Sequence, residues 1–296
     1  MALGKPRSVR RAAQRRGQPH APTITMNDTQ TILTSTPPET EKGSACWSAP
    51  ICSASFPGVS LYHGDSLEIV PKLRGINGVV TSPPYNQKID SFKPSGMHKE
   101  SRWVEKISQC YADSMPESDY QQWQIETLNA LYDATDETAS CFYNHKIRWR
   151  DGELLIPLEW LRRTKWKMRQ EIIWARNGSC TMNARMFAPS DERIYWLRKE
   201  THKWNQECVS YMSVWNIASQ PSPEHPCVYP VQIPARCIMA TTDPGDTVLD
   251  PYMGNGTTGI AAIRAGRKFV GIEKDERHFA NAVERIRREL SQGVML

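Results

Sequence analysis

Short apolar runs that suit β-strands alternate with helix-like runs from Val59 almost to the end of the chain. Strands that alternate with helices predict a mostly parallel sheet with helices on both faces, which is an α/β fold. The expected strands cover Val59–Asp65, 75–80, Ala139–Tyr143, Met168–Trp174, Arg193–Arg198, Thr247–Asp250 and Lys268–Ile272. One short expected helix ends at Leu73, and another begins at Ser118 with a Ser118/Gln121 capping box. The other expected helices cover Ile156–Thr164, Tyr229–Thr241, Thr257–Ala265 and Glu276–Glu289.

The composition narrows the class of protein. Of the 296 residues, 39% are hydrophobic and 23% are charged, which is typical of a soluble globular chain. No apolar run is long enough to span a bilayer, so we expect no membrane association. The 8 cysteines form no CxxC pair, which argues against a zinc ribbon and a disulfide framework. We therefore expect no metal and a reducing, cytoplasmic compartment.

The beginning of the chain has a different composition. Residues 1–26 carry six Lys or Arg residues and no acid, and Thr, Ser, Pro and Glu dominate up to about Pro50. This composition predicts a disordered basic and polar arm over residues 1–55. Met26 is a possible alternative start, in which case the basic stretch is translated upstream sequence.

A second basic region is rich in tryptophan. Between Phe142 and Asn205 there are 14 Lys or Arg against 7 Asp or Glu, together with six of the 10 tryptophans. Interleaved cations and aromatic rings suit a surface that binds phosphates and stacks on bases. A solvated helix face with buried tryptophans is the plainer interpretation of the same pattern.

Two short segments carry the chemistry. The run Asp246–Asp250 is an apolar strand that ends in an acid, and Gly254, Gly256 and Gly259 follow it with the formal spacing of a dinucleotide loop. About 20 residues later another strand ends at Glu273, where an acid can accept hydrogen bonds from ribose hydroxyls; on chemistry alone this fits NAD as well as S-adenosylmethionine. The other segment is Thr81–Asn86, in which a double proline ends a strand. Alone, it also fits a plain proline-rich turn.

Together, and in this order, the two segments resemble those of the DNA amino-methyltransferases of the permuted (beta) group, in which the catalytic motif precedes the S-adenosylmethionine loop. The matching positions run from about Leu61 to Leu290. The resemblance implies a seven-stranded, mostly parallel, Rossmann-like methyltransferase sheet with a basic target-recognition insertion. It implies the catalytic residues Ser82, Pro83, Pro84 and Tyr85. It also implies the cofactor-binding residues Asp65, Thr81, Asp250, Pro251, Tyr252, Gly254, Asn255, Gly256, Thr257, Thr258, Glu273 and Lys274.

The resemblance also divides the chain. Residues 56–175 would form the catalytic half with a mobile, DNA-facing loop at 86–117, and 176–222 the target-recognition insertion. Residues 223–296 would form the cofactor half, in which His225-Pro226 and Tyr229-Pro230 resemble the segment that covers the methionine end. Tyr252 stands where the family more often has Phe, and Asn255 where a smaller residue is usual.

The implied reaction is methylation of the exocyclic amine of a base that is flipped out of duplex DNA. This amine is a poor nucleophile because its lone pair is conjugated with the ring. Ser82 Oγ and the Pro83 carbonyl can accept its two N–H groups and draw the nitrogen toward a tetrahedral shape, while Tyr85 offers a flat face for stacking. Cysteine-based methylation of ring carbon is not expected: Cys227 lies in the segment resembling the cofactor cover, and Cys141 and His145 are expected to line the pocket wall.

Family members with Ser as the first clamp residue mostly methylate cytosine N4, so this base is favoured over adenine N6. More distant alternatives are an RNA or protein methyltransferase, an NAD-dependent oxidoreductase and a non-catalytic DNA-binding module. The expected partners are double-stranded DNA and a possible cognate restriction endonuclease, with the chain as a monomer or homodimer.

Overall fold

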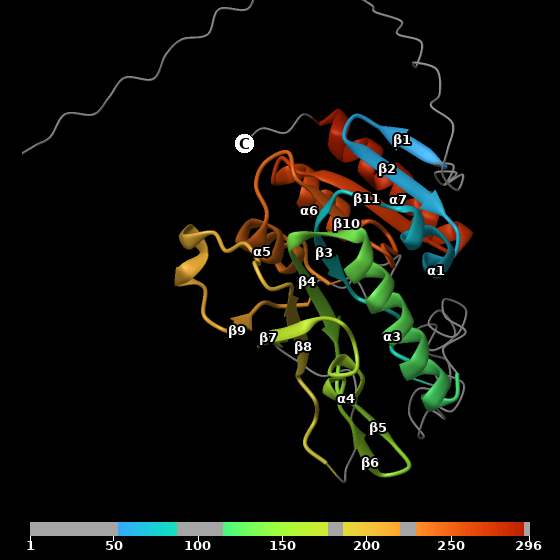
Figure 1. The fold of residues 1–296 in the computed structure, drawn as a ribbon, viewed down its shortest axis with the longest axis vertical. Helices are drawn as coiled ribbons and strands as arrows, with labels where there is room; N and C mark the ends of the chain where they lie inside the picture. Colours follow the sequence, from blue (N-terminus) through green and yellow to red (C-terminus); the bar gives the residue numbers. More distant parts are fainter. Residues whose placement is uncertain (1–52, 88–114, 177–185, 220–228, 293–296) are drawn as a thin grey trace, which may run out of the picture. The chain divides into compact units, whose positions relative to one another are not determined.

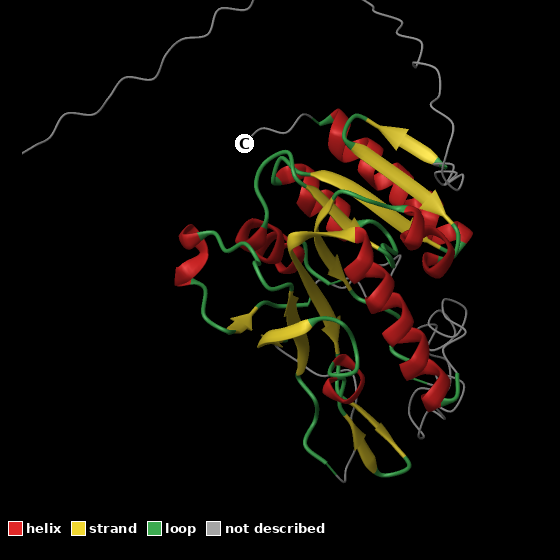
Figure 2. Ribbon diagram, viewed as in Figure 1, coloured by secondary structure: helices red, strands yellow, loops and turns green. Residues whose placement is uncertain are grey.

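The computed structural model of the protein describes residues 53–87, 115–176, 186–219 and 229–292. The expected N-terminal arm, apart from its last residues, lies outside the described residues. So do most of the expected loop 86–117, residues 177–185 and 220–222 of the expected insertion, and the His225-Pro226 and Cys227 positions. Figures 1 and 2 show the arrangement of the remaining elements.

One sheet organises the described residues, and its order is β1-β2-β11-β10-β3-β4-β8-β7-β9. From β2 to β4 all neighbours are parallel, whereas β8 is antiparallel to both β4 and β7. The strands in chain order are β1 Ala54–Phe56, β2 Val59–His63, β3 Ile76–Thr81, β4 Thr135–His145, β7 Lys167–Ala175, β8 Asp191–Arg198, β9 Val214–Asn216, β10 Thr247–Asp250 and β11 Lys268–Glu273.

The expected mostly parallel sheet is confirmed, but the number of strands differs. All seven expected strands are present, and the three-residue strands β1 and β9 add one at each edge. Strands this short show no period that could be recognised in the sequence. The described part of the expected insertion contributes β8 and β9 to the main sheet. There β8 lies between β4 and β7, two strands of the expected catalytic half, so the two ranges share one sheet.

Helices cover both faces of the sheet (Figure 1). Alternate residues of a strand point to opposite faces, and β3 shows this clearly: Val80 packs in one core cluster and Val79 in the other. The cluster around Val80 includes side chains from α5 Gln232–Thr241, α6 Thr257–Arg264 and α7 Glu276–Ser291. The cluster around Val79 includes α1 Ser66–Ile69, the 3-10 turn η1 Val70–Lys72, α3 Glu117–Ala134 and α4 Leu158–Leu161.

Two local expectations need correction, and one hairpin is present that the sequence did not predict. The helix α3 begins at Glu117 after Pro116 and has no side-chain cap, because Ser118 bonds to Asp119 and Gln121 bonds to Glu117 instead of forming a capping box. The helix expected at Ile156–Thr164 is the single turn α4. Before it lies an unexpected hairpin, β5 Arg148–Arg150 and β6 Glu153–Leu155, whose two turn residues both have positive φ.

Most tryptophans of the basic region belong to the core. Trp160, Trp166, Trp174 and Trp196 are buried, so they cannot serve as open stacking platforms. Trp149 on the β5–β6 hairpin and Trp204 before η3 Gln206–Ser210 remain exposed. For four of the six tryptophans in this region, the plainer interpretation as buried residues is therefore correct. Among the described helices, none has the length and apolar character needed to cross a membrane.

Gly271 allows β11 to pass close beneath the loop that follows β10. A Cβ at Gly271 would lie 2.4 Å from Met253 Sδ and 2.7 Å from the Phe269 ring. We expect Gly271→Ala to lower the free energy of unfolding by ~1–3 kcal/mol because both neighbours are buried and must move. Urea titration measures the change, and Lys268→Ala on the exposed part of the same strand should stay within ~0.5 kcal/mol of wild type. Equal stability of both variants would contradict this packing.

Candidate active site

The carboxyl ends of the parallel strands bring the expected site residues to one edge of the sheet, where ligands bind in open α/β sheets. β11 ends at Glu273, β10 at Asp250 and β3 at Thr81. Asp65 follows β2, and the last two residues of β4 are Asn144 and His145. The strand order therefore places the expected cofactor residues beside the expected clamp, although nearly 170 positions separate Thr81 and Asp250 in the chain.

Asp250 is the hydrogen-bonding centre of the loop after β10. One carboxylate oxygen accepts from Thr81 Oγ1 at 2.9 Å and from the Tyr252 amide at 3.1 Å, and the other accepts from Thr258 Oγ1 at 2.6 Å. The side chain is buried, and burial raises the pKa of Asp250 to about 6 against the lowering effect of these hydrogen bonds. In this structure Asp250 shapes the loop and ties it to β3.

Glu273 holds the other side of the same loop. Its two oxygens accept from the amides of Gly254 and Asp275, at 2.9 and 2.8 Å. Burial raises the pKa of Glu273 above its usual value. Gly254 has φ of 50°, and a Cβ built there would meet nothing within 4 Å. The backbone of this loop therefore faces open space at Gly254, beside a carboxylate with lone pairs left to accept further hydrogen bonds.

The remaining expected cofactor residues surround this loop. Asp65 caps α1 through the Leu67 amide and pairs with the exposed Lys274 at 3.0 Å. The Pro251 carbonyl accepts from Ser66 Oγ, and the Tyr252 hydroxyl bonds to Thr127. Thr257 and Thr258 are buried in the first turn of α6, after Gly256, and Asn255 has a buried side-chain oxygen without a hydrogen-bond partner among the described residues.

The Ser-Pro-Pro-Tyr segment follows β3 directly and joins a polar cluster. Ser82 Oγ lies 2.8 Å from the Tyr85 hydroxyl, which donates to Glu192 Oε2 at 3.1 Å. Asn144 Nδ2 contacts all three groups, at 3.3 Å from Ser82 Oγ, 2.8 Å from Tyr85 and 3.0 Å from Glu192. On the far side of Glu192, Arg176 donates to Oε1 at 3.1 Å.

The Tyr85 ring rests against His145, with ring centroids 4.6 Å apart. His145 is buried, and burial together with the Arg148 charge holds the pKa of its imidazole well below the usual value, so the ring is neutral. Its Nδ1 faces the Lys146 carbonyl at 2.7 Å and must carry the hydrogen, while Nε2 faces the Tyr120 hydroxyl at 2.8 Å. The Tyr120 hydroxyl oxygen also lies 2.7 Å from the Pro84 carbonyl oxygen, and its single hydrogen is shared between these two acceptors, so α3 and His145 of β4 together support the double proline.

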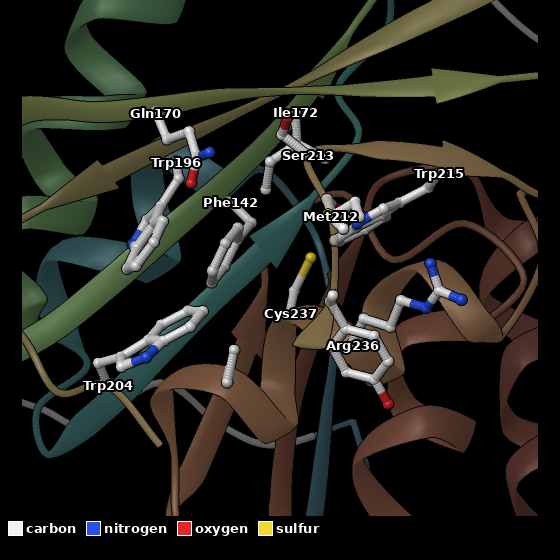
Figure 3. Close-up of a pocket in the computed structure, with 12 residues that line it drawn as sticks. Phe142, Gln170, Ile172, Trp196, Trp204, Met212, Ser213, Trp215, Arg236 and Cys237 are labelled. Atoms are coloured by element: carbon white, nitrogen blue, oxygen red, sulfur yellow. The ribbon is translucent and has the colours of Figure 1, made fainter. Parts of the chain in front are cut away.

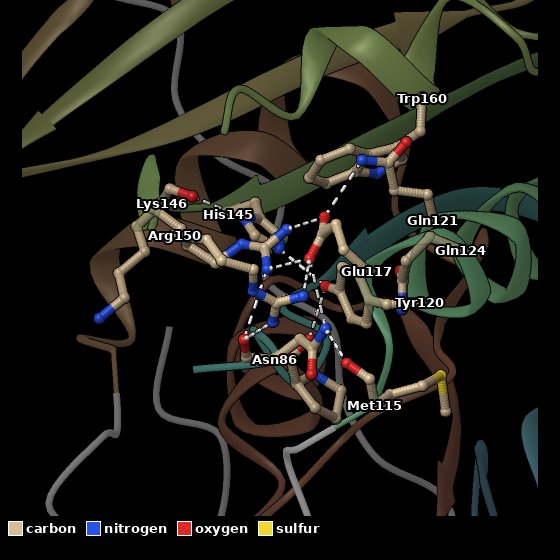
Figure 4. Close-up of polar contacts among 12 residues, drawn as sticks. Asn86, Met115, Glu117, Tyr120, Gln121, Gln124, His145, Lys146, Arg150 and Trp160 are labelled. Atoms are coloured by element: carbon tan, nitrogen blue, oxygen red, sulfur yellow. Dashed lines mark hydrogen bonds and ion pairs between the residues drawn. The ribbon is translucent and has the colours of Figure 1, made fainter. Parts of the chain in front are cut away.

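A buried ionic cluster fixes the residue after Tyr85 (Figure 4). Asn86 has φ of 54°, an unusual conformation for a residue with a side chain. Its side-chain Nδ2 donates to the Met115 carbonyl and to Glu117. Glu117 accepts two hydrogen bonds from Arg148, at 2.8 and 2.9 Å. Burial raises the pKa of Glu117, but the Arg148 and Gln121 hydrogen bonds and the Arg148 and Arg150 charges outweigh it and leave the pKa below its usual value.

An aromatic pocket lies on the face of the sheet that α5 covers, away from the strand ends (Figure 3). Phe142, Trp196 and Trp204 line one side, and Trp215 and Arg236 line the other. It contains none of the expected site residues. Cys141, on the opposite face of β4, is fully buried, and burial raises the pKa of its thiol, so it offers no thiolate.

Comparison with known proteins agrees with this geometry. A family model described as DNA methylase, of the N6/N4 type, matches residues 76–284. The chain belongs to this DNA methylase family. Type II methyltransferase M2.LlaDCHI from Lactococcus lactis subsp. cremoris is 32% identical over 43% of this chain and 54% of its own length. M.Cfr9I from Citrobacter freundii is 26% identical over 78% of this chain and 89% of its own. The match thus spans about half the length of the first of these relatives.

Solved structures support the fold. The cytosine-N4-specific PvuII DNA methyltransferase matches with a TM-score of 0.62 at 19% identity, over 79% of this chain and 92% of its own. The complex of M1.HpyAVI with S-adenosylmethionine matches with a TM-score of 0.53 at 22% identity, over 77% of this chain and 99% of its own. The methyltransferase-like α/β architecture that the sequence predicted is therefore confirmed for this family member.

Sequence reasoning did not identify Glu192, Arg176 or Tyr120 as site residues. Glu192 precedes the expected strand Arg193–Arg198, and an acid at that position is a weak signal. Only the antiparallel direction of β8 brings the start of this strand to the edge where the parallel strands end. His145 was expected to line the pocket wall, and the structure places both His145 and its neighbour Asn144 beside Tyr85.

The raised pKa of Asp250 predicts a pH-dependent stability. The pKa rises from 3.8 to about 6 on folding, so this carboxyl stabilises the fold fully below pH 3.8 and loses that contribution as pH rises through 6. An asparagine side chain does not titrate, so we expect the stability of wild type relative to Asp250→Asn to fall by up to ~3 kcal/mol from pH 4 to pH 7, measured by urea titration. Asp119→Asn, at an exposed position, should follow wild type; a pH-independent difference for Asp250→Asn would contradict the shift.

Proposed function

We propose that the chain methylates the exocyclic amine of a base in double-stranded DNA, with S-adenosylmethionine as the methyl donor and cytosine N4 as the favoured target. One observation carries the proposal. Thr81 bonds to Asp250, the last residue of β10, from which the loop continues, and the next residue after Thr81, Ser82, belongs to the amine clamp. Adjacent residues of one strand end thus connect the two segments that a methyl transfer must bring together.

The loop after β10 suits the cofactor. The open space at Gly254 lets the nucleoside approach the backbone, and Glu273 has lone pairs left for the ribose hydroxyls. Asp65 lies at the end of β2, beyond β11, where its carboxylate can accept from the adenine amine. When bound, S-adenosylmethionine supplies a methyl group on a sulfonium that is open to in-line displacement. Asp250, Thr257 and Thr258 are buried and position the loop.

The Ser-Pro-Pro-Tyr segment suits the amine. Ser82 Oγ and the Pro83 carbonyl accept hydrogen bonds from the two N–H groups, which frees the nitrogen lone pair for attack. The Tyr85 ring, supported on one side by His145, provides the stacking surface for the extruded base. No acid or base is needed to form the new bond, and the methylated amine then releases one N–H proton to water, so alignment supplies most of the catalysis.

The choice of base rests on Ser82. Family members with Ser at this position mostly methylate cytosine N4, and the PvuII enzyme, which is cytosine-N4-specific, is among the matched structures. Adenine N6 is the alternative, because a hydroxyl can accept from either amine. The relatives are Type II methyltransferases, which supports duplex DNA as the substrate and a cognate restriction endonuclease as a partner. Target recognition within 176–222, a cytoplasmic location and a monomeric or dimeric state remain predictions.

The direct test is methyl transfer from labelled S-adenosylmethionine to duplex DNA, RNA and protein, followed by digestion of the DNA to nucleosides and mass spectrometry. We expect label in DNA alone and N4-methylcytosine as the product. N6-methyladenine would change the base but keep the reaction. Label in RNA or protein, with none in DNA, would refute the proposal.

Variants of the clamp separate chemistry from cofactor binding. We expect Ser82→Ala and Tyr85→Ala each to lower kcat by about 100-fold or more, because the amine loses an acceptor or the base its stacking surface. Affinity for S-adenosylmethionine, measured by calorimetry, should change little. Ser118→Ala, at an exposed position on α3, serves as the control. Turnover within a few-fold of wild type in both clamp variants would remove this segment from the catalytic site.

Variants of the loop test the cofactor assignment. We expect Glu273→Ala to weaken S-adenosylmethionine binding by about 10- to 100-fold, because the ribose hydroxyls lose their acceptor and the Gly254 amide loses its partner. Gly254→Val should also weaken binding, because its side chain enters the open space and the residue has positive φ. Calorimetry measures both, with Glu276→Ala, three residues beyond Glu273, as the control. Unchanged affinity in both variants would assign the cofactor to another part of the chain.

A further inference from the structure

A buried carboxylate lies behind the amine clamp and has no part in the reaction as described so far. Glu192 is the second residue of β8, and 8% of its surface is exposed. Oε2 faces Tyr85 and Asn144, while Oε1 faces Arg176. Burying a charge is costly unless it is paired and hydrogen-bonded, and Glu192 meets both conditions at the site.

The direction of the hydrogen bonds follows from the chemistry of these groups. A carboxylate only accepts, so the single Tyr85 hydroxyl hydrogen points to Glu192. The Tyr85 oxygen can then accept from Ser82, and the 2.8 Å contact between the two hydroxyls takes the single Ser82 hydrogen. The chain of donors therefore runs from Ser82 to Tyr85 to Glu192.

This direction decides what Ser82 can offer to a base. With its hydrogen committed to Tyr85, Ser82 Oγ presents lone pairs, and an amine N–H needs an acceptor. If these hydrogen bonds ran in the opposite direction, the Ser82 hydrogen would point at the amine hydrogen and repel it. Asn144 supports the same direction. Its Nδ2 lies 2.8 Å from the Tyr85 hydroxyl oxygen and 3.0 Å from Glu192 Oε2, but 3.3 Å from Ser82 Oγ, so its two hydrogens go mainly to Tyr85 and Glu192.

We infer that Glu192 is a positioning residue for methyl transfer: through the Tyr85 hydroxyl it orients the Ser82 hydroxyl as an acceptor for the base amine. The inference rests on the proposed function and extends it to a residue that does not touch the base. Arg176 holds the carboxylate in place from its far side. The acceptor character of the clamp thus comes from β8, a strand distant in sequence from the Ser-Pro-Pro-Tyr segment.

Glu192→Gln keeps the shape of the side chain and tests the direction. Arg176 holds the amide oxygen, so the amide nitrogen faces Tyr85 and donates to it, while Asn144 Nδ2 loses the acceptor that Oε2 provides in wild type. The Tyr85 hydrogen then turns to Ser82 and occupies the lone pair meant for the base. We expect kcat for DNA methylation to fall about 10- to 100-fold, with affinity for S-adenosylmethionine and melting temperature near wild type. The matched control is Glu171→Gln on β7, which loses only a surface ion pair with Arg193.

A double-mutant cycle distinguishes orientation from a general structural role. Tyr85→Phe keeps the ring but removes the connecting hydroxyl, so it should lower kcat by a similar factor. In the Tyr85→Phe background, Glu192→Gln should lower kcat by less than about threefold more, because the hydrogen-bonded connection from Glu192 to Ser82 is already broken. Factors that multiply fully would show two independent roles and overturn the inference.

Each result bears on a separate claim. Wild-type protein that labels no DNA would refute the proposed function, and this inference with it. Active wild type with a fully active Glu192→Gln variant would overturn the inference and leave the proposed function standing. If Glu192→Gln lowers the melting temperature, the test uses Tyr85→Phe instead. A wild-type kcat in Tyr85→Phe would equally overturn the inference.

Discussion

The candidate site depends on one buried carboxylate that joins two distant strand ends. Asp250 accepts hydrogen bonds from Thr81 on β3, from the Tyr252 amide in the loop after β10 and from Thr258 in the first turn of α6. In a low-dielectric surrounding such bonds are strong, and each unsatisfied partner would be costly. The contact therefore ties the end of β3, where the Ser-Pro-Pro-Tyr segment begins, to the end of β10, where the glycine loop begins, and the proposed methyl transfer must bring these two segments together.

The clamp itself is held from several sides. Tyr120 on α3 bonds to the Pro84 carbonyl, and the Glu117 and Arg148 pair holds Asn86 in its positive-φ conformation. On β8, Glu192 sets the direction of the hydrogen bonds that reach Ser82. A short segment that must act as a rigid acceptor thus draws on α3, β4, β8 and the β5–β6 hairpin, because a loop alone has too few contacts to hold its geometry.

The aromatic side chains illustrate the division between core and site. Trp160 and Trp196 fill the two faces of the sheet, so the tryptophan content of the middle region mainly reflects packing. Their burial removes these rings from any surface that a base could contact. Tyr85, backed by His145, is the ring that the structure places beside the clamp.

The sequence by itself determined the α/β class and the seven main strands, and it singled out the loop after β10 and the Ser-Pro-Pro-Tyr segment as the expected site, because these depend on local patterns: apolar periods, glycines and a double proline. It did not determine the short strands β1 and β9, the β5–β6 hairpin or the length of α4, which depend on packing partners. It could not identify Glu192 either. An acid near a strand end has no local signal for its direction, and only antiparallel pairing of β8 with β4 places that carboxylate at the edge where the parallel strands end. Tertiary structure therefore decided which polar groups meet, since hydrogen bonds depend on distance in space and the chain separates these residues widely.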